Sequence, residues 1–204
     1  ATLDDGRVAL KLAESPFYAE GGGQVGDRGT ITTATGTFRV EATRKLGDGI
    51  LHVGAVEAGT IEPGQTADLA VDGSRVATRC NHTATHLLHS ALRAELGDNA
   101  TQRGSMVDPD RLRFDFDNGQ ALSIEQIAQV EHRVNAMIRA DHAVRWSEKS
   151  REEAMATPGL VAGFGEKYGE VVRVGDVGEG VGMGLYGGPD GKSSRLNSGT
   201  SSPT

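Results

Sequence analysis

The clearest periodic pattern in the chain is helical and lies between Ser74 and Leu96. Apolar residues recur there at the spacing of three and four that places them on one face of a helix. Gly97 follows at once, and a glycine at this position is a typical end of a helix. We therefore predict a helix over Ser74–Leu96. Its buried face consists of Cys80, Ala84, Leu87, Leu88, Ala91, Leu92 and Leu96.

The chain before this helix has the shorter, alternating pattern of strands, interrupted by turns that contain glycine and proline. Short strands at such regular spacing indicate a small β-barrel or a sandwich. The predicted strands are Arg7–Leu12, Gly29–Thr33, Phe38–Thr43, Ile50–Val56 and Thr66–Val71.

After the helix, strand and helix patterns alternate without the strict rhythm of a parallel α/β fold, which favours an α+β class. Apolar and polar residues alternate over Arg111–Asp117, as in a half-buried strand. Ser123 with Gln126, and Ser150 with Glu153, are capping boxes that begin two further helices. The apolar face of the first of these helices consists of Ile127, Val130, Val134, Met137 and Ile138.

Two more strands are predicted, over His142–Trp146 and Tyr168–Val177. From Gly178 onward the composition shifts to glycine, serine, proline and threonine with few apolar residues. Such a composition cannot bury enough apolar surface to fold, so we predict that Gly191–Thr204 is disordered.

Composition narrows the range of partners and compartments. The net charge of −7 over 204 residues argues against nonspecific nucleic-acid binding through overall charge, although a local basic surface is compatible with it. Cys80 is the single cysteine, which excludes an internal disulfide and fits a cytoplasmic protein. No apolar run reaches the roughly 20 residues of a membrane helix. Because the chain begins with Ala1, we expect a processed or excised piece of a longer protein.

His82 and His86 lie one helical turn apart, on a stripe nearly opposite the apolar face. Two neutral imidazoles at this spacing can bind one metal ion, but histidines at i and i+4 also occur by chance on solvated helix faces. The glutamate that a metalloprotease has between its two histidines is absent, which argues against peptidase chemistry.

The segment Ser15–Gly29, which we call the Gly-rich loop, contains three consecutive glycines, Gly21–Gly23. Glycines weaken helices and strands, so they need another reason to be there. One interpretation is a flexible loop. The other is a backbone that approaches a ligand closely, with Gln24 and Asp27 as polar contacts. A phosphate-binding loop is excluded because no Lys-Ser or Lys-Thr pair follows.

Four segments in order resemble the editing domain of bacterial alanyl-tRNA synthetase. They are SPFYAEGGGQVGDRG (15–29), NHTATHLLHSALR (81–93), GSMVDPDRLRFDFD (104–117) and GFGEKYGEVVRV (163–174). Free-standing alanyl-tRNA editing proteins and the editing domain of threonyl-tRNA synthetase share parts of this pattern. The resemblance implies a small β-barrel over 1–73, a two-layer α/β editing core over 74–190 and a disordered tail over 191–204.

The resemblance also implies a chemistry, which is hydrolysis of the ester that joins serine or glycine to the tRNA for alanine. In this family Gln24 with Gly22 and Gly23 would line the editing pocket. His82 and His86 would be zinc ligands. The family's late Cys-Gly-Gly-Thr-His motif is replaced here, with Tyr186 at the cysteine and Asp190 at the histidine. Asp190 is the candidate third ligand, and we expect zinc to bind weakly.

The partners implied are the acceptor end of tRNA(Ala) and the aminoacylation domain of a parent synthetase. Arg103, Arg111 and Arg113 are the candidate contacts to the tRNA backbone. His89 is predicted to be solvated or to face RNA, whereas the remaining histidines are predicted to be structural or exposed. The alternative function is a catalytically silent tRNA-binding or structural remnant, which the loss of the Cys-Gly-Gly-Thr-His motif favours.

Overall fold

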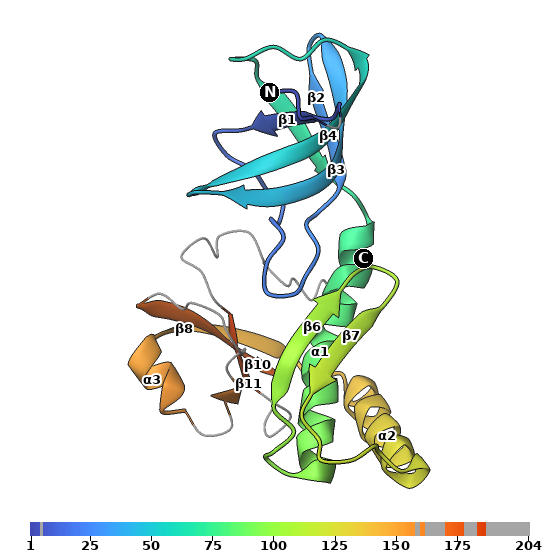
Figure 1. The fold of residues 1–204 in the computed structure, drawn as a ribbon. Coiled ribbons are helices and arrows are strands. Elements are labelled where there is room, and N and C mark those ends of the chain that lie inside the picture. The colour runs from blue at the N-terminus through green and yellow to red at the C-terminus, as the bar shows by residue number, and fades with distance from the viewer. Residues whose placement is uncertain (5, 158–159, 162–169, 178–182, 187–204) are drawn as a thin grey trace, which may run out of the picture. The chain divides into compact units, whose positions relative to one another are not determined.

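The computed structural model describes residues 1–4, 6–157, 160–161, 170–177 and 183–186 (Figure 1). The chain divides into two compact units. Unit 1 consists of Ala1–Cys80 and Met106–Arg111, and unit 2 of Asn81–Ser105 and Leu112–Thr204. No helix in the described ranges has the length and apolar character needed to span a membrane.

Unit 1 contains a five-stranded antiparallel sheet with the strand order β1-β4-β3-β2-β5. The predicted strands are all present, although β3 and β4 extend beyond their predicted ends. The bounds are β1 (Val8–Lys11), β2 (Gly29–Thr33), β3 (Gly36–Leu46), β4 (Gly49–Gly59) and β5 (Ala67–Val71).

The predicted small β-barrel is not supported, since the sheet formed by the described residues is open. Closure requires the two edge strands to pair with each other. Here β1 pairs with β4 and β5 pairs with β2. Alternation along a strand indicates which side chains face the core but not which strands meet at the edges. The core of this unit is Phe17, Ile31, Phe38 and Val40.

The helix α1 (Ser74–Leu96) has the predicted bounds, and Gly97 follows it with a φ of +87°. The prediction that Cys80 is buried is wrong, because its side chain is exposed. Among the described residues, the apolar face of α1 is exposed near its start and buried in its C-terminal half. Val76 is 63% exposed near the start of α1, whereas Leu87 is 6% exposed.

In unit 2, α1 packs with the two-stranded sheet of β6 (Gln102–Val107) and β7 (Leu112–Phe116) and with α2 (Ile124–Ala140) (Figure 1). The strand β6 was not among the predicted elements. The buried cluster is Ala91, Leu92, Ala100 and Val130, with Phe114 and Phe116 packed against it.

The capping box of Ser123 and Gln126 is confirmed at the start of α2. The predicted apolar face of α2 is only partly buried. Val130 is buried and Val134 and Met137 pack on the cluster, but Ile127 and Ile138 are 51% and 53% exposed. The covered part of this face is thus narrower than the apolar stripe.

A second sheet in unit 2 has the order β8-β10-β11-β9. Its strands are β8 (Val144–Ser150), β9 (Leu160–Val161), β10 (Val171–Val177) and β11 (Met183–Tyr186). The pairs β8–β10 and β10–β11 are antiparallel, and β9 is parallel to β11. The short helix α3 (Arg151–Met155) begins at the predicted capping box of Ser150 and Glu153. The predicted disorder over 191–204 lies outside the described residues.

Candidate functional site

The tip of the Gly-rich loop is a tight turn rather than a flexible segment. The backbone N–H of Gly21 donates to Gln24 O at 3.1 Å, and the N–H of Gln24 donates back to Gly21 O at 3.0 Å. The two residues between them, Gly22 and Gly23, have φ angles of +59° and +77°. A two-residue turn with positive φ at both positions favours glycine strongly. The turn explains these glycines structurally, and their contact with a ligand stays a prediction.

This turn is attached to the end of β6 in unit 1. The N–H of Val25 donates to Val107 O at 3.0 Å, and the N–H of Val107 donates to Gly23 O at 2.8 Å. Gln24 forms a parallel bridge with Val107 and is only 8% exposed. Gln24 therefore occupies a fixed, buried position.

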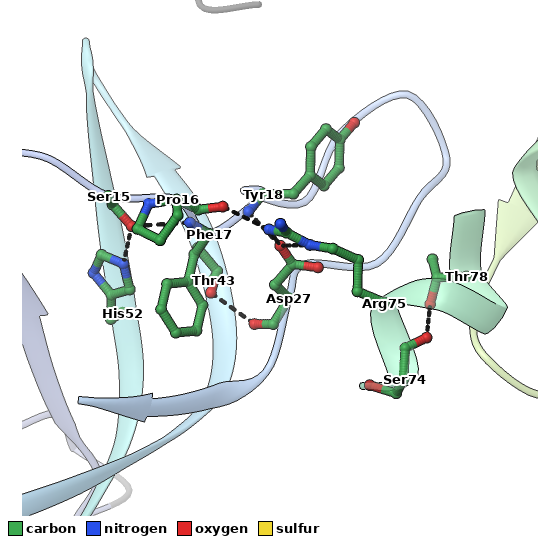
Figure 2. A network of polar contacts seen from close by, with 10 residues as sticks. All are labelled: Ser15, Pro16, Phe17, Tyr18, Asp27, Thr43, His52, Ser74, Arg75 and Thr78. Carbon is green, nitrogen blue, oxygen red and sulfur yellow. Dashed lines mark hydrogen bonds and ion pairs between the residues drawn. The ribbon is translucent and has the colours of Figure 1, made fainter. Parts of the chain in front are cut away.

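The base of the loop is closed by Asp27, which is 5% exposed. Figure 2 shows its carboxylate facing Arg75, from the first turn of α1. Asp27 Oδ2 accepts from the N–H of Tyr18 at 2.6 Å and from Arg75 Nε at 2.9 Å, and Arg75 Nη2 also donates to it. The backbone oxygen of Asp27 accepts from the hydroxyl of Thr43 at 2.7 Å. Instead of reaching toward a ligand, as one interpretation expected, Asp27 holds the loop closed.

The start of the loop is held by a hydrogen bond between Ser15 Oγ and His52 Nε2, 2.7 Å long (Figure 2). His52 Nδ1 lies 3.3 Å from Leu10 O. A carbonyl only accepts, so Nδ1 carries the hydrogen in this arrangement and the hydroxyl of Ser15 donates to Nε2. His52 is fully buried, and burial lowers its pKa. Of the two alternatives predicted for His52, structural or exposed, the structure shows the structural one.

His82 and His86 of α1 form a stacked pair in unit 2. The ring centroids of His82 and His86 lie 5.2 Å apart with an angle of 29° between the planes. Burial lowers the pKa of His82. Burial, with the neighbouring His82 and His89, lowers the pKa of His86 to about 3. Both rings are therefore neutral near pH 7, which is the form of imidazole that binds a metal ion or accepts a proton.

The prediction that His89 is solvated or faces RNA is wrong. Its side chain is buried, its Nε2 lies 3.0 Å from Ala100 O, and its ring lies 5.0 Å from the ring of Phe114. The prediction rested on the position of His89 on the same helical stripe as His82 and His86. The C-terminal part of that stripe is instead covered by residues that follow α1 in sequence.

The described residues supply two candidate zinc ligands. No group of three or more histidine, cysteine, aspartate or glutamate side chains forms among them. A catalytic zinc site takes three protein ligands, so His82 and His86 fit only part of such a site. Asp190, the candidate third ligand, lies outside the described residues. Tyr186 ends β11, where its backbone pairs with Arg173.

Each of the three arginines predicted to contact tRNA has an aspartate partner. Arg103 Nε donates to Asp117 Oδ2 at 2.6 Å. Arg113 Nη2 lies 3.1 Å from Asp115 Oδ2, and Arg111 Nε lies 3.6 Å from Asp108 Oδ2. The three arginine side chains are 49%, 74% and 62% exposed, and ion pairs of exposed arginines are weak, so phosphate can compete for them. Contact with RNA stays a prediction.

Comparison with known proteins adds a context to these features. Residues 3–75 match the family model described as tRNA synthetases class II (A). The chain is 49% identical over 179 residues to the alanine–tRNA ligase of Paracoccus denitrificans, which covers 87% of this chain and 20% of the relative. It is 49% identical over 174 residues to the Roseiflexus ligase, a match that covers 84% of this chain and 19% of the relative. It is 52% identical over 168 residues to the Thermus thermophilus ligase, a match that covers 82% of this chain and 19% of the relative. The chain spans about a fifth of the length of these relatives. Over more than four fifths of its own length it is thus similar to a segment of alanine–tRNA ligases, and its first third matches the class II tRNA synthetases.

Proposed function

We propose that this chain hydrolyses tRNA(Ala) that has been mischarged with serine or glycine, as a segment or divergent version of an alanine–tRNA ligase. The observation that carries the proposal is the ordered turn that holds Gln24 buried, in a chain about half identical to alanine–tRNA ligases. A pocket selective for alanine rejects close analogues only weakly, so a second hydrolytic site removes what the first accepts.

In the proposed reaction, water attacks the carbonyl carbon of the ester that joins the amino acid to the tRNA. The acyl C–O bond then breaks, a proton from the water passes to the leaving oxygen, and the products are the free amino acid and the tRNA with its terminal hydroxyl. Gln24 offers both an amide donor and an amide acceptor, which can orient the amino acid or the attacking water. Gly22 and Gly23 have no side chains and leave the backbone accessible, so that the N–H groups of these two glycines can stabilise the developing oxyanion. Two histidine ligands do not complete a zinc site, so no step of this proposal requires the metal.

The proposed partners are the acceptor end of tRNA(Ala) and the aminoacylation domain of a parent synthetase. The exposed side chains of Arg103, Arg111 and Arg113 would exchange their aspartate partners for phosphates of the tRNA backbone. The alternative is a silent tRNA-binding or structural remnant. It is favoured by Tyr186 and Asp190, which stand where the family has a cysteine and a histidine.

The test is deacylation of seryl-tRNA(Ala) and alanyl-tRNA(Ala) measured side by side. We expect slow release of serine above the rate without protein, with alanine spared. Gln24→Ala is expected to slow serine release by about tenfold to a hundredfold, since it removes an orienting group. Gln129→Ala, on the exposed surface of α2, is the matched control and should leave the rate unchanged. Equal hydrolysis of both substrates would contradict the editing assignment, and hydrolysis of neither above the rate without protein would favour the silent remnant.

We propose that zinc binds weakly at His82 and His86, with Asp190 or water as the remaining ligands. The purified chain should therefore contain less than one zinc per chain by elemental analysis and lose it on dialysis against a chelator. Replacing Tyr186 with cysteine and Asp190 with histidine should raise the affinity strongly, because thiolate and imidazole suit zinc better than phenol and carboxylate.

His86→Ala should remove the residual zinc, and His132→Ala, an exposed histidine of α2, should not. Tight stoichiometric zinc in the unmodified chain would contradict this set of ligands. An unchanged affinity after the double replacement would show that the segment containing Asp190 does not reach the histidine pair.

A further inference from the structure

Arg75 lies outside the Gly-rich loop and bonds to both of its limbs, one at the start of the loop and one at its end (Figure 2). Arg75 Nη2 donates to Pro16 O at 2.5 Å, near the start of the loop, and Arg75 Nε donates to Asp27 Oδ2 at 2.9 Å, near its end. The side chain of Asp27 is 4% exposed and that of Arg75 is 25% exposed, so water competes weakly for the ion pair between them.

Asp27, near the end of the loop, is also bonded to Tyr18, near its start. Its Oδ2 also accepts from the N–H of Tyr18, and its own N–H donates to Tyr18 O at 2.9 Å. Residues 18 and 27 are therefore bonded across the loop. The turn that carries Gln24 lies between them.

We propose that Arg75 is a positioning residue of this site, which holds the two limbs of the Gly-rich loop together and so fixes the pose of Gln24. Its catalytic consequence rests on the proposed function, whereas its effect on the loop does not. The guanidinium suits this task because its planar fork can donate to a carboxylate and a carbonyl at once. A lysine in the same place would keep the charge but lose the fixed geometry.

Loss of the guanidinium group of Arg75 should loosen the tip of the loop while leaving the sheet intact. The amides that report on the tip are those of Gln24, Val25 and Val107, which donate to Gly21 O, Val107 O and Gly23 O. In Arg75→Ala we expect these three amides to lose protection against hydrogen exchange in the full chain. Amides of the β3–β4 ladder should keep theirs, because the side-chain hydrogen bonds of Arg75 go to Asp27 and Pro16 and not to that ladder.

In deacylation of seryl-tRNA(Ala), Arg75→Ala should lower kcat by about tenfold to a hundredfold with little change in KM, as expected when a reacting group is misplaced. Arg75→Lys should recover part of both readouts. Arg44→Ala, an exposed arginine of β3, is the matched control and should change neither.

Unchanged exchange at the three loop amides in Arg75→Ala would overturn the proposal, and so would an unchanged kcat in an active chain. If the Arg75→Ala variant is unfolded, the same two measurements are made on Arg75→Lys. Hydrogen exchange and kcat equal to those of the unmodified chain in Arg75→Lys would then overturn the proposal. If the unmodified chain releases no serine, the proposed function fails, and the exchange measurement alone decides whether Arg75 positions the loop.

Discussion

The free energy of unfolding is expected to fall steeply as the pH is lowered from 6.5 to 5. Four of the six histidines have lowered pKa values in the folded chain, chiefly through burial. In the unfolded chain these side chains take up protons near pH 6.5, whereas in the folded chain they do so only at lower pH. Their contribution to stability is complete above pH 6.5 and is lost as the pH falls. The four are His52, His82, His86 and His89.

Each such histidine contributes a slope of up to about 1.4 kcal/mol per pH unit. For His86, with a folded pKa of about 3, the loss should continue through the whole acid range. Denaturant unfolding at several pH values between 7 and 5 measures the slope, in a range where the carboxylates stay ionised. His86→Gln should make the dependence shallower, and His132→Gln, at an exposed site, should not. Identical slopes for both variants and the unmodified chain would contradict the assignment to His86.

Gly26→Ala is expected to be among the most destabilising single substitutions in the Gly-rich loop. A Cβ at this position would lie 2.2 Å from Thr43 O and 3.0 Å from Thr43 N, both of them backbone atoms of β3. No side-chain rotation relieves such a contact, so the loop must move away from β3. Overpacking of this kind costs roughly 1–3 kcal/mol or more.

The measurement is the denaturant midpoint of the full chain, compared with that of Gly73→Ala. Gly73 belongs to the same unit, and a Cβ there meets nothing within 4 Å. Its replacement should therefore change stability by less than about 0.5 kcal/mol. Similar stabilities of the two alanine variants would show that the loop does not pack on β3 as described.

The features that were predictable from sequence are those fixed by residues close together in the chain. The bounds of α1 follow from its own apolar spacing and the glycine after it, and they are confirmed. The capping boxes at Ser123 and Ser150 are confirmed for the same reason, since each joins residues three positions apart. Such local patterns decide where an element begins and ends.

The features that sequence reasoning missed depend on contacts between distant residues. Nothing in the sequence pairs Asp27 with Arg75 or Ser15 with His52, which are 48 and 37 positions apart. The exposure of Cys80 and the burial of His89 depend on which part of α1 is covered by later segments. The open edges of the first sheet likewise depend on which strands meet. The sequence pointed to Asp27 as a polar residue of the Gly-rich loop, but it did not indicate that Arg75 is its partner.

The hydrogen bonds that hold the Gly-rich loop also bear on the order of folding. They join Ser15 to β4, Asp27 to the first turn of α1 and Val25 to the end of β6, across separations of up to 82 positions along the chain (25 to 107). Such contacts form at low entropic cost only after the sheet and the helix have brought their ends together. We therefore expect the loop to close late, after the main folding barrier. Substitutions in it should shorten the lifetime of the folded chain while leaving the rate of its formation nearly unchanged.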